Sequence, residues 1–181
     1  MESLKDRKIA VFLMIIMIVL GTVFGSHRSL GKLYNSAKDV FYNGEKGDGF
    51  SIQHDLDDRF EESLKLVKIA EKYPSLNNKY IDDVKAARDK LKNAGTIKDK
   101  SKANSELDAA VFALYNELGN QKLSSQDEKY RTSSYGTFSS YGDTISHNSY
   151  NSIARKFNNT LNKFPANLLG RLTGIQELDT F

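Results

Sequence analysis

The spacing of apolar residues is most regular in the last third of the chain, where it predicts one long amphipathic helix from Ser125 to Phe164. Apolar positions recur there in steps of mostly three, four or their sums, which places them on one side of a helix. They are Tyr130, Phe138, Tyr141, Ile145, Ile153, Phe157, Leu161 and Phe164. At 1.5 Å per residue the helix would be roughly 60 Å long. No single shorter helix covers that length, so we expect several elements to pack against it.

Three upstream segments have the same spacing and predict shorter helices. They are residues 51–73, 78–93 and about 101–118. Pro74 ends the first, and a polar linker over residues 96–100 precedes the third. Four amphipathic helices joined by short turns predict an all-α fold, an antiparallel four-helix bundle over residues 51–165. The last helix is longer than its neighbours, so one end of it extends beyond them. The short helix predicted at residues 30–43 has the right length to pack beside this extending end.

An apolar run follows a polar tail at residues 1–8 and extends without a charge from Ile9 to Phe24. As a helix it would be about 25 Å long, close to the roughly 30 Å of a bilayer core. Residues 9–25 therefore predict one transmembrane helix, with the lipid bilayer as its partner. The alternative is a cleaved signal peptide, but the run is long for one and no Ala-X-Ala site follows it.

Basic residues flank the apolar run on both sides. Three lie within Lys5–Lys8, and three are spread over Arg28–Lys38. The positive-inside rule slightly favours an amino terminus in the cytoplasm, which would put the bundle outside it.

Residues 26–50 combine the juxtamembrane helix with a glycine-rich segment, Gly44–Gly49, which has three glycines in six residues. A phosphate-binding loop needs a strand before it and a Gly-Lys-Ser/Thr ending, and this segment has neither. We therefore interpret the segment as a hinge between helices.

Composition excludes several classes of function. The net charge is only +3 and acidic and basic residues alternate along most of the chain, so nucleic acid is not an expected partner. The chain has no cysteine, which excludes disulfides, zinc-thiolate sites and lipidation at cysteine. The acidic residues between Asp55 and Glu62 lie near a helix start, where the dipole favours them, and are interpreted as a solvated face. The pattern predicts no catalytic residue, no metal and no cofactor.

Four aromatic residues of the long helix have two possible roles. Tyr130, Tyr135, Phe138 and Tyr141 could line a cleft for a small ligand, but rings at helical spacing are more often core.

The tail at residues 166–181 begins with a short amphipathic strip that has a single cation. It consists of Leu168, Leu169, Arg171, Leu172 and Ile175. One interpretation places this strip on the membrane surface with Arg171 near lipid phosphates. The other folds the tail back onto the bundle.

Three motifs near the carboxyl end carry a family resemblance. They are Tyr150-Asn151, Phe157-Asn158 and Phe164-Pro165-Ala166-Asn167. With upstream matches such as Arg59-Phe60 and Ala87-Arg88, this pattern resembles the LemA family over about residues 34–175. The sequence departs from the family at the glycine-rich break, at Glu62-Ser63-Leu64 and at Thr173-Gly174-Ile175, so it looks like a divergent member.

The resemblance implies an amino-terminal membrane helix, a helical bundle, structural roles for the motif residues and no established enzymatic activity. Some descriptions of the family place the amino terminus outside the cell, opposite to the charge rule. Two functions are kept: a single-pass scaffold or adaptor of the bacterial cell envelope that binds another protein, and an extracytoplasmic sensor that binds a small ligand. An enzyme is a distant third, and the oligomeric state is left open.

Overall fold

The computed structural model describes residues 2–181, with side chains from Arg7 onward. Met1 and the side chains up to Asp6, which belong to the expected tail at residues 1–8, lie outside the described part. Residues 2–181 form helices and no strand, so the all-α fold class is confirmed. The elements are α1 (Glu2–Asn43), the 3-10 helix η1 (Glu45–Gly47), α2 (Ile52–Ala70), α3 (Asn78–Asn93), α4 (Ile97–Gly119), α5 (Ser125–His147), α6 (Ser149–Leu161) and α7 (Ala166–Thr173).

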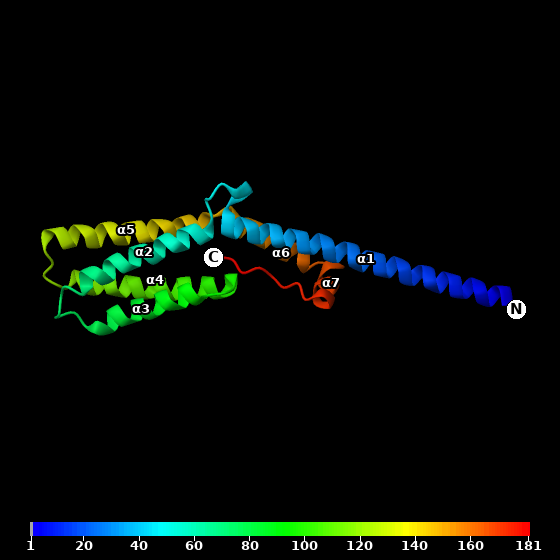
Figure 1. Ribbon diagram of the computed structural model, residues 1–181, viewed down its shortest axis with the longest axis horizontal. Helices are drawn as coiled ribbons and strands as arrows, with labels where there is room; N and C mark the ends of the chain where they lie inside the picture. Colours follow the sequence, from blue (N-terminus) through cyan, green and yellow to red (C-terminus); the bar gives the residue numbers. More distant parts are fainter. Residues whose placement is uncertain (1) are drawn as a thin grey trace.

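Helices α2 to α5 form an antiparallel bundle at one end of an elongated molecule (Figure 1). Helix α2 packs mainly on α5, and α3 packs mainly on α4. The core between them is closed by large apolar side chains with almost no exposed surface. These include Leu56, Leu66, Val84, Leu107, Val111, Leu114 and Phe138.

Each helix of the bundle starts at a side chain that accepts a hydrogen bond from the first helical turn, which satisfies an otherwise unpaired N–H. The capping residues are Ser51, Asn77, Thr96 and Ser124. The predicted linker at residues 96–100 is wrong for this reason. The Thr96 hydroxyl caps the Asp99 N–H at 3.0 Å, so α4 already begins at Ile97.

Helix α1 is continuous over 42 residues, so the prediction of a separate helix at residues 30–43 is wrong. Its glycines and serines lower helix propensity, but the segment has no proline to break it. The helix ends at the glycine-rich segment, as the hinge interpretation predicts. Gly44 turns the chain with φ of 80°, a left-handed conformation that favours glycine.

The predicted single helix at residues 125–164 is also wrong, because it breaks at Asn148. Asn148 has extended backbone angles (φ −61°, ψ 140°), and its side chain caps the Tyr150 N–H at 3.0 Å. Helix α5 therefore belongs to the bundle, whereas α6 packs on α1. The second half of α1 packs beside α6, the part of this region that extends beyond the bundle, as predicted.

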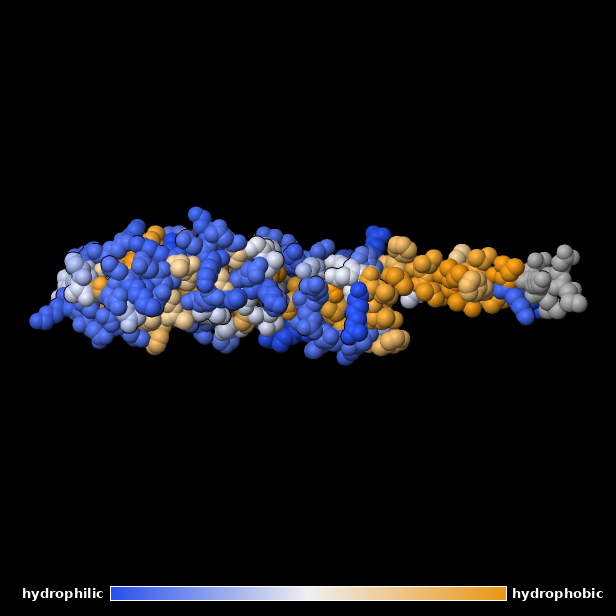
Figure 2. Space-filling view, turned by 90° about the horizontal axis from the view of Figure 1, so that it is seen from below, coloured by the Kyte–Doolittle hydropathy of each residue, from blue (hydrophilic) through white to orange (hydrophobic). Residues whose placement is uncertain are grey.

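The two halves of α1 have different surroundings. Leu30, Ala37 and Phe41 are buried against the folded part, whereas residues 7–22 are all exposed. This exposed half protrudes from the molecule, and the face of it that Figure 2 shows is mostly apolar. It is the one helix of the described chain that is long and apolar enough to cross a membrane.

Candidate functional site

Helix α6 carries four of the seven motif residues and contacts α1. These residues are buried or half-buried: Tyr150, Asn151, Phe157 and Asn158. The Tyr150 ring meets the Phe41 ring edge-on at 5.2 Å, and the Phe157 ring lies 5.8 Å from the Tyr34 ring. The aromatic members of the motif therefore join α6 to the second half of α1, which connects the bundle to the protruding helix.

The two motif asparagines of α6, Asn151 and Asn158, bind the last residues of the chain. After α7, residues 174–181 run back along α6 as an extended segment that we call the strap (Figure 1). The Asn158 side chain accepts a hydrogen bond from the Leu178 N–H at 2.8 Å and donates one to the Leu178 carbonyl at 2.8 Å. Asn158 thus pairs with both backbone groups of one residue, while the Leu178 side chain is buried beside it.

Two further hydrogen bonds hold the end of the strap. The Tyr150 hydroxyl donates to the Asp179 carbonyl at 2.8 Å, and Asn151 Oδ1 accepts from the Phe181 N–H at 2.8 Å. Asn151 Nδ2 also donates to the Ile145 carbonyl at 2.8 Å, which ties the strap to the break between α5 and α6. Burial, with the nearby Asp179 carboxylate as a smaller cause, raises the pKa of the Tyr150 phenol above its usual range.

The Phe-Pro-X-Asn motif lies apart from this arrangement. Phe164 is 82% exposed, and Pro165 and Asn167 are exposed as well. Asn167 Oδ1 accepts from the Leu168 N–H at 2.7 Å, within the first turn of α7. This motif forms the turn from α6 into α7, and its aromatic ring faces outward.

The residues of the amphipathic strip, on α7 and just after it, differ in burial. Leu169 is buried and Ile175 is half-buried against the core. Leu168, Arg171 and Leu172 are exposed. The strap folds back along α6, while Leu168 and Leu172 of α7 remain exposed, so neither interpretation of the strip is decided by the fold alone.

An open cleft of about 630 Å³ lies between the end of α6, α7, the strap and the first turn of α4. Its lining consists of Lys98, Leu161, Asn162, Asn167, Gly170, Arg171, Gly174, Ile175, Gln176, Glu177 and Asp179. Two cations and two anions balance in this lining, so the cleft does not favour one sign of ligand charge. In the described part of the chain, no three His, Asp or Glu side chains gather closely enough to hold a metal ion.

The four aromatic residues considered for a ligand cleft do not face a common space. Phe138 is buried beneath the Arg59 guanidinium, whose carbon lies 4.0 Å from the ring centre. Tyr135 stacks on Tyr115 at 4.0 Å. Tyr130 is half-exposed and Tyr141 is half-buried at other positions along α5. The core interpretation is confirmed for Phe138, and the Tyr135 ring is engaged by a neighbouring side chain.

The fold buries two arginines, Arg59 and Arg88, which were matched to the family pattern in the sequence but were not assigned a structural role. Arg59 on α2 bonds the side chains of Asn104 and Asp108 on α4. Burial lowers the pKa of the Arg59 guanidinium, although Asp108 opposes this shift. Arg88 on α3 donates to the Ser63 hydroxyl at 2.8 Å and lies 3.7 Å from the Phe60 ring centre. Both cations join helices within the bundle, and their signal in the sequence was an arginine at an inward-facing position.

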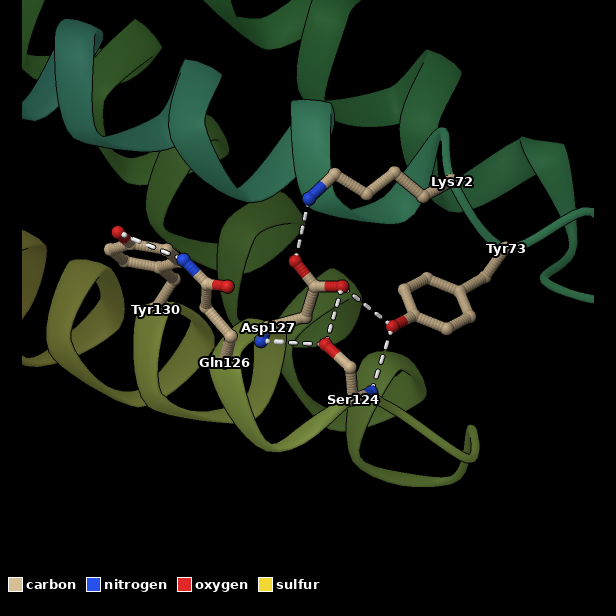
Figure 3. A network of polar contacts seen from close by, with 6 residues as sticks. All are labelled: Lys72, Tyr73, Ser124, Gln126, Asp127 and Tyr130. Carbon is tan, nitrogen blue, oxygen red and sulfur yellow. Dashed lines mark hydrogen bonds and ion pairs between the residues drawn. The ribbon is translucent and has the colours of Figure 1, made fainter.

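A polar network closes the far end of the bundle (Figure 3). Asp127 accepts hydrogen bonds from the Lys72 ammonium at 2.6 Å, the Tyr73 hydroxyl at 2.8 Å and the Ser124 hydroxyl at 2.9 Å. These bonds, that of Lys72 being the largest cause, lower the pKa of the Asp127 carboxyl below its usual range. The network joins the end of α2 to the start of α5, so its role is structural.

Comparison with known proteins gives one match. The model of the LemA family matches residues 50–181, from the end of the glycine-rich segment through the strap. No curated protein and no solved structure matches the chain. The match covers all three motifs of α6 and α7, and it includes the strap that two of them bind. The chain therefore belongs to the LemA family.

Proposed function

We propose that this LemA-family protein is a membrane-anchored scaffold of the bacterial cell envelope, which binds another protein and catalyses no reaction. The observation that carries the proposal is the uninterrupted helix α1. Its apolar run has no buried residue, while its second half is packed against α6 and α7. A bilayer would bury the apolar side chains of the exposed half of α1. The packed half would then hold the bundle rigidly, away from the lipid.

A half-exposed aromatic cluster on α4 and α5 supports the binding of a protein partner. Phe112 is 53% exposed, its ring lies 6.3 Å from that of Tyr135, and Tyr135 stacks on Tyr115. The Arg131 guanidinium covers Tyr115 with its carbon 4.2 Å from the ring centre. Aromatic residues and arginine are enriched at protein interfaces, which favours this face of the bundle as the contact surface.

Photo-crosslinking in intact membranes tests this proposal. A photoreactive amino acid is placed at Phe112, and a matched variant carries it at Ala86, an exposed position on α3. A discrete adduct with a second protein at position 112, absent at position 86, is expected. An adduct between two copies of this chain, or equal labelling at both positions, would contradict the adaptor role.

The second candidate is a small-ligand-binding module, and the open cleft beside the strap is the observation that favours it. Lys98 and Arg171 line this cleft together with three side-chain amides, a composition suited to a polar ligand. The test is the melting temperature of the full chain in detergent with a panel of polar metabolites. A rise that disappears in Arg171→Ala would favour this function over the scaffold.

The proposed orientation places the bundle outside the cytoplasm. The chain has no cysteine, so Phe112→Cys introduces a single thiol. A membrane-impermeant maleimide should label this thiol in intact cells. Labelling only after the cells are broken would assign the bundle to the cytoplasm.

A further inference from the structure

Helix α7 lies at the point where α1 leaves its exposed, apolar stretch. Of the folded elements, α7 reaches furthest along α1 towards the amino terminus (Figure 1). Every residue from 7 to 22 is exposed, Val23 is the first that packs against the core, and Leu30 is the first that is buried. The apolar run Ile9–Phe24 therefore ends at the level of α7.

An apolar surface is exposed at this level. Phe164 is 82% exposed, Leu168 53% and Leu172 67%. Leu168 and Leu172 are four residues apart and share one face of α7, while Leu169 packs into the core from another. Figure 2 shows an apolar patch at the base of the folded part, next to the apolar surface of α1. We call Phe164, Leu168 and Leu172 the α7 patch.

The fold packs together two stretches of the chain beside the α7 patch that contain basic residues and no acidic residue. Residues 21–38 of α1 and residues 144–176 carry seven Lys and Arg and no Asp or Glu. They are Arg28, Lys32, Lys38, Arg155, Lys156, Lys163 and Arg171. Beyond residue 38, the rest of the chain has sixteen basic and twenty-one acidic residues. The basic excess thus lies in the part of α1 next to its apolar run and in α6 and α7, which pack on that part, while Glu177 and Asp179 of the strap share a cleft with Arg171.

We propose that the α7 patch rests in the surface of the same bilayer that α1 enters, among anionic lipid headgroups. Lipid fits this surface because the patch is continuous with the end of the apolar run, and because the basic residues Lys163 and Arg171 lie next to it and on α7. Side chains of a helix in this position lie about 5–10 Å into the boundary between headgroups and acyl chains, with Lys and Arg at the phosphates. Arg171 on α7 and Lys163 just before it lie at the lipid phosphates. The inference rests on the proposed anchor and adds a second membrane contact, which fixes the tilt of the bundle.

Fluorescence quenching in vesicles tests the inference with the full chain. Leu172→Cys carries an environment-sensitive fluorophore, and the vesicles contain an anionic phospholipid and quencher-bearing lipids, some with the quencher near the headgroup and some with it at the middle of the acyl chain. Matched probes are Ile16→Cys within the apolar run and Phe112→Cys on the bundle. We expect blue-shifted, quenched emission at position 172 and unquenched emission at position 112. In Leu168→Asn, or in vesicles of zwitterionic lipid alone, quenching at position 172 should decrease.

Each outcome separates this inference from the anchor on which it rests. Strong quenching at position 16 with emission at 172 equal to that at 112 would overturn the α7 contact and leave the anchor intact. Absence of quenching at position 16 would overturn both. A blue shift at 172 that disappears when the protein is diluted in excess lipid would show that a second copy covers the patch, and this too would overturn the lipid contact.

Discussion

Removal of the Asn158 side chain should release the strap. Asn158 makes two hydrogen bonds of 2.8 Å with the backbone of Leu178. A hydrogen bond of this kind contributes about 0.5–1.5 kcal/mol net, so Asn158→Ala should destabilise the closed strap by about 1–3 kcal/mol. Alanine is a better helix former than asparagine, so a loss of stability cannot come from the propensity of α6.

Native-state hydrogen exchange measures this change directly, because the Leu178 N–H is one of the two donors involved. A cost of about 1–3 kcal/mol corresponds to exchange roughly 5- to 150-fold faster at Leu178. Asn159→Ala is the matched control, since Asn159 is the next residue of α6 and is exposed. If the strap opens as one unit, the Phe181 amide should accelerate by the same factor. Equal exchange at Leu178 in the two variants would refute the proposed role of Asn158.

Three further predictions follow from burial, backbone geometry and charge. Phe157→Ala and Leu161→Ala should each cost about 2–5 kcal/mol in the denaturant unfolding of the full chain in detergent, because both side chains are buried; unchanged midpoints would remove them from the core. Gly44→Ala should lower the melting temperature more than Gly47→Ala, because both have positive φ but only at Gly44 would an added Cβ meet backbone atoms, the Phe50 nitrogen at 2.9 Å and the Phe50 carbonyl oxygen at 3.0 Å; equal losses would contradict this. The folded state lowers the Asp127 pKa, so its contribution is present above the unfolded value of about 4 and is lost as the pH falls through the folded pKa. The difference in melting temperature between the wild type and Asp127→Asn should therefore shrink in acid, and a difference independent of pH would contradict the assignment.

Local signals in the sequence predicted some helices well and others poorly. The apolar spacing and Pro74 allowed α2 and α3 to be placed within a few residues. The break at Asn148 was missed because the apolar spacing continues from Ile145 to Ile153 across it. Its signal was a run of small polar residues, and asparagine favours both helix caps and extended backbone.

The strap could not be predicted, because it is held by contacts between distant residues. Its residues have no apolar period, and α6 binds them through their backbone groups, which carry no sequence signal. The motif asparagines, Asn151 and Asn158, were recognised through the family resemblance, but their partners became apparent only in the folded chain. Burial of Leu169 beside exposed Leu168 likewise depends on how α7 packs against α1 and α6.

The intact mass of the protein in washed membranes tests the central claim, that α1 is an uncleaved anchor for the bundle. Membranes from cells that make the full chain are washed at alkaline pH, which removes proteins held only at the surface. We predict that the chain stays in the membrane pellet with the mass of all 181 residues, less at most the initiating Met1. A soluble protein whose mass shows cleavage near Phe24 would identify a signal peptide and contradict the anchored scaffold.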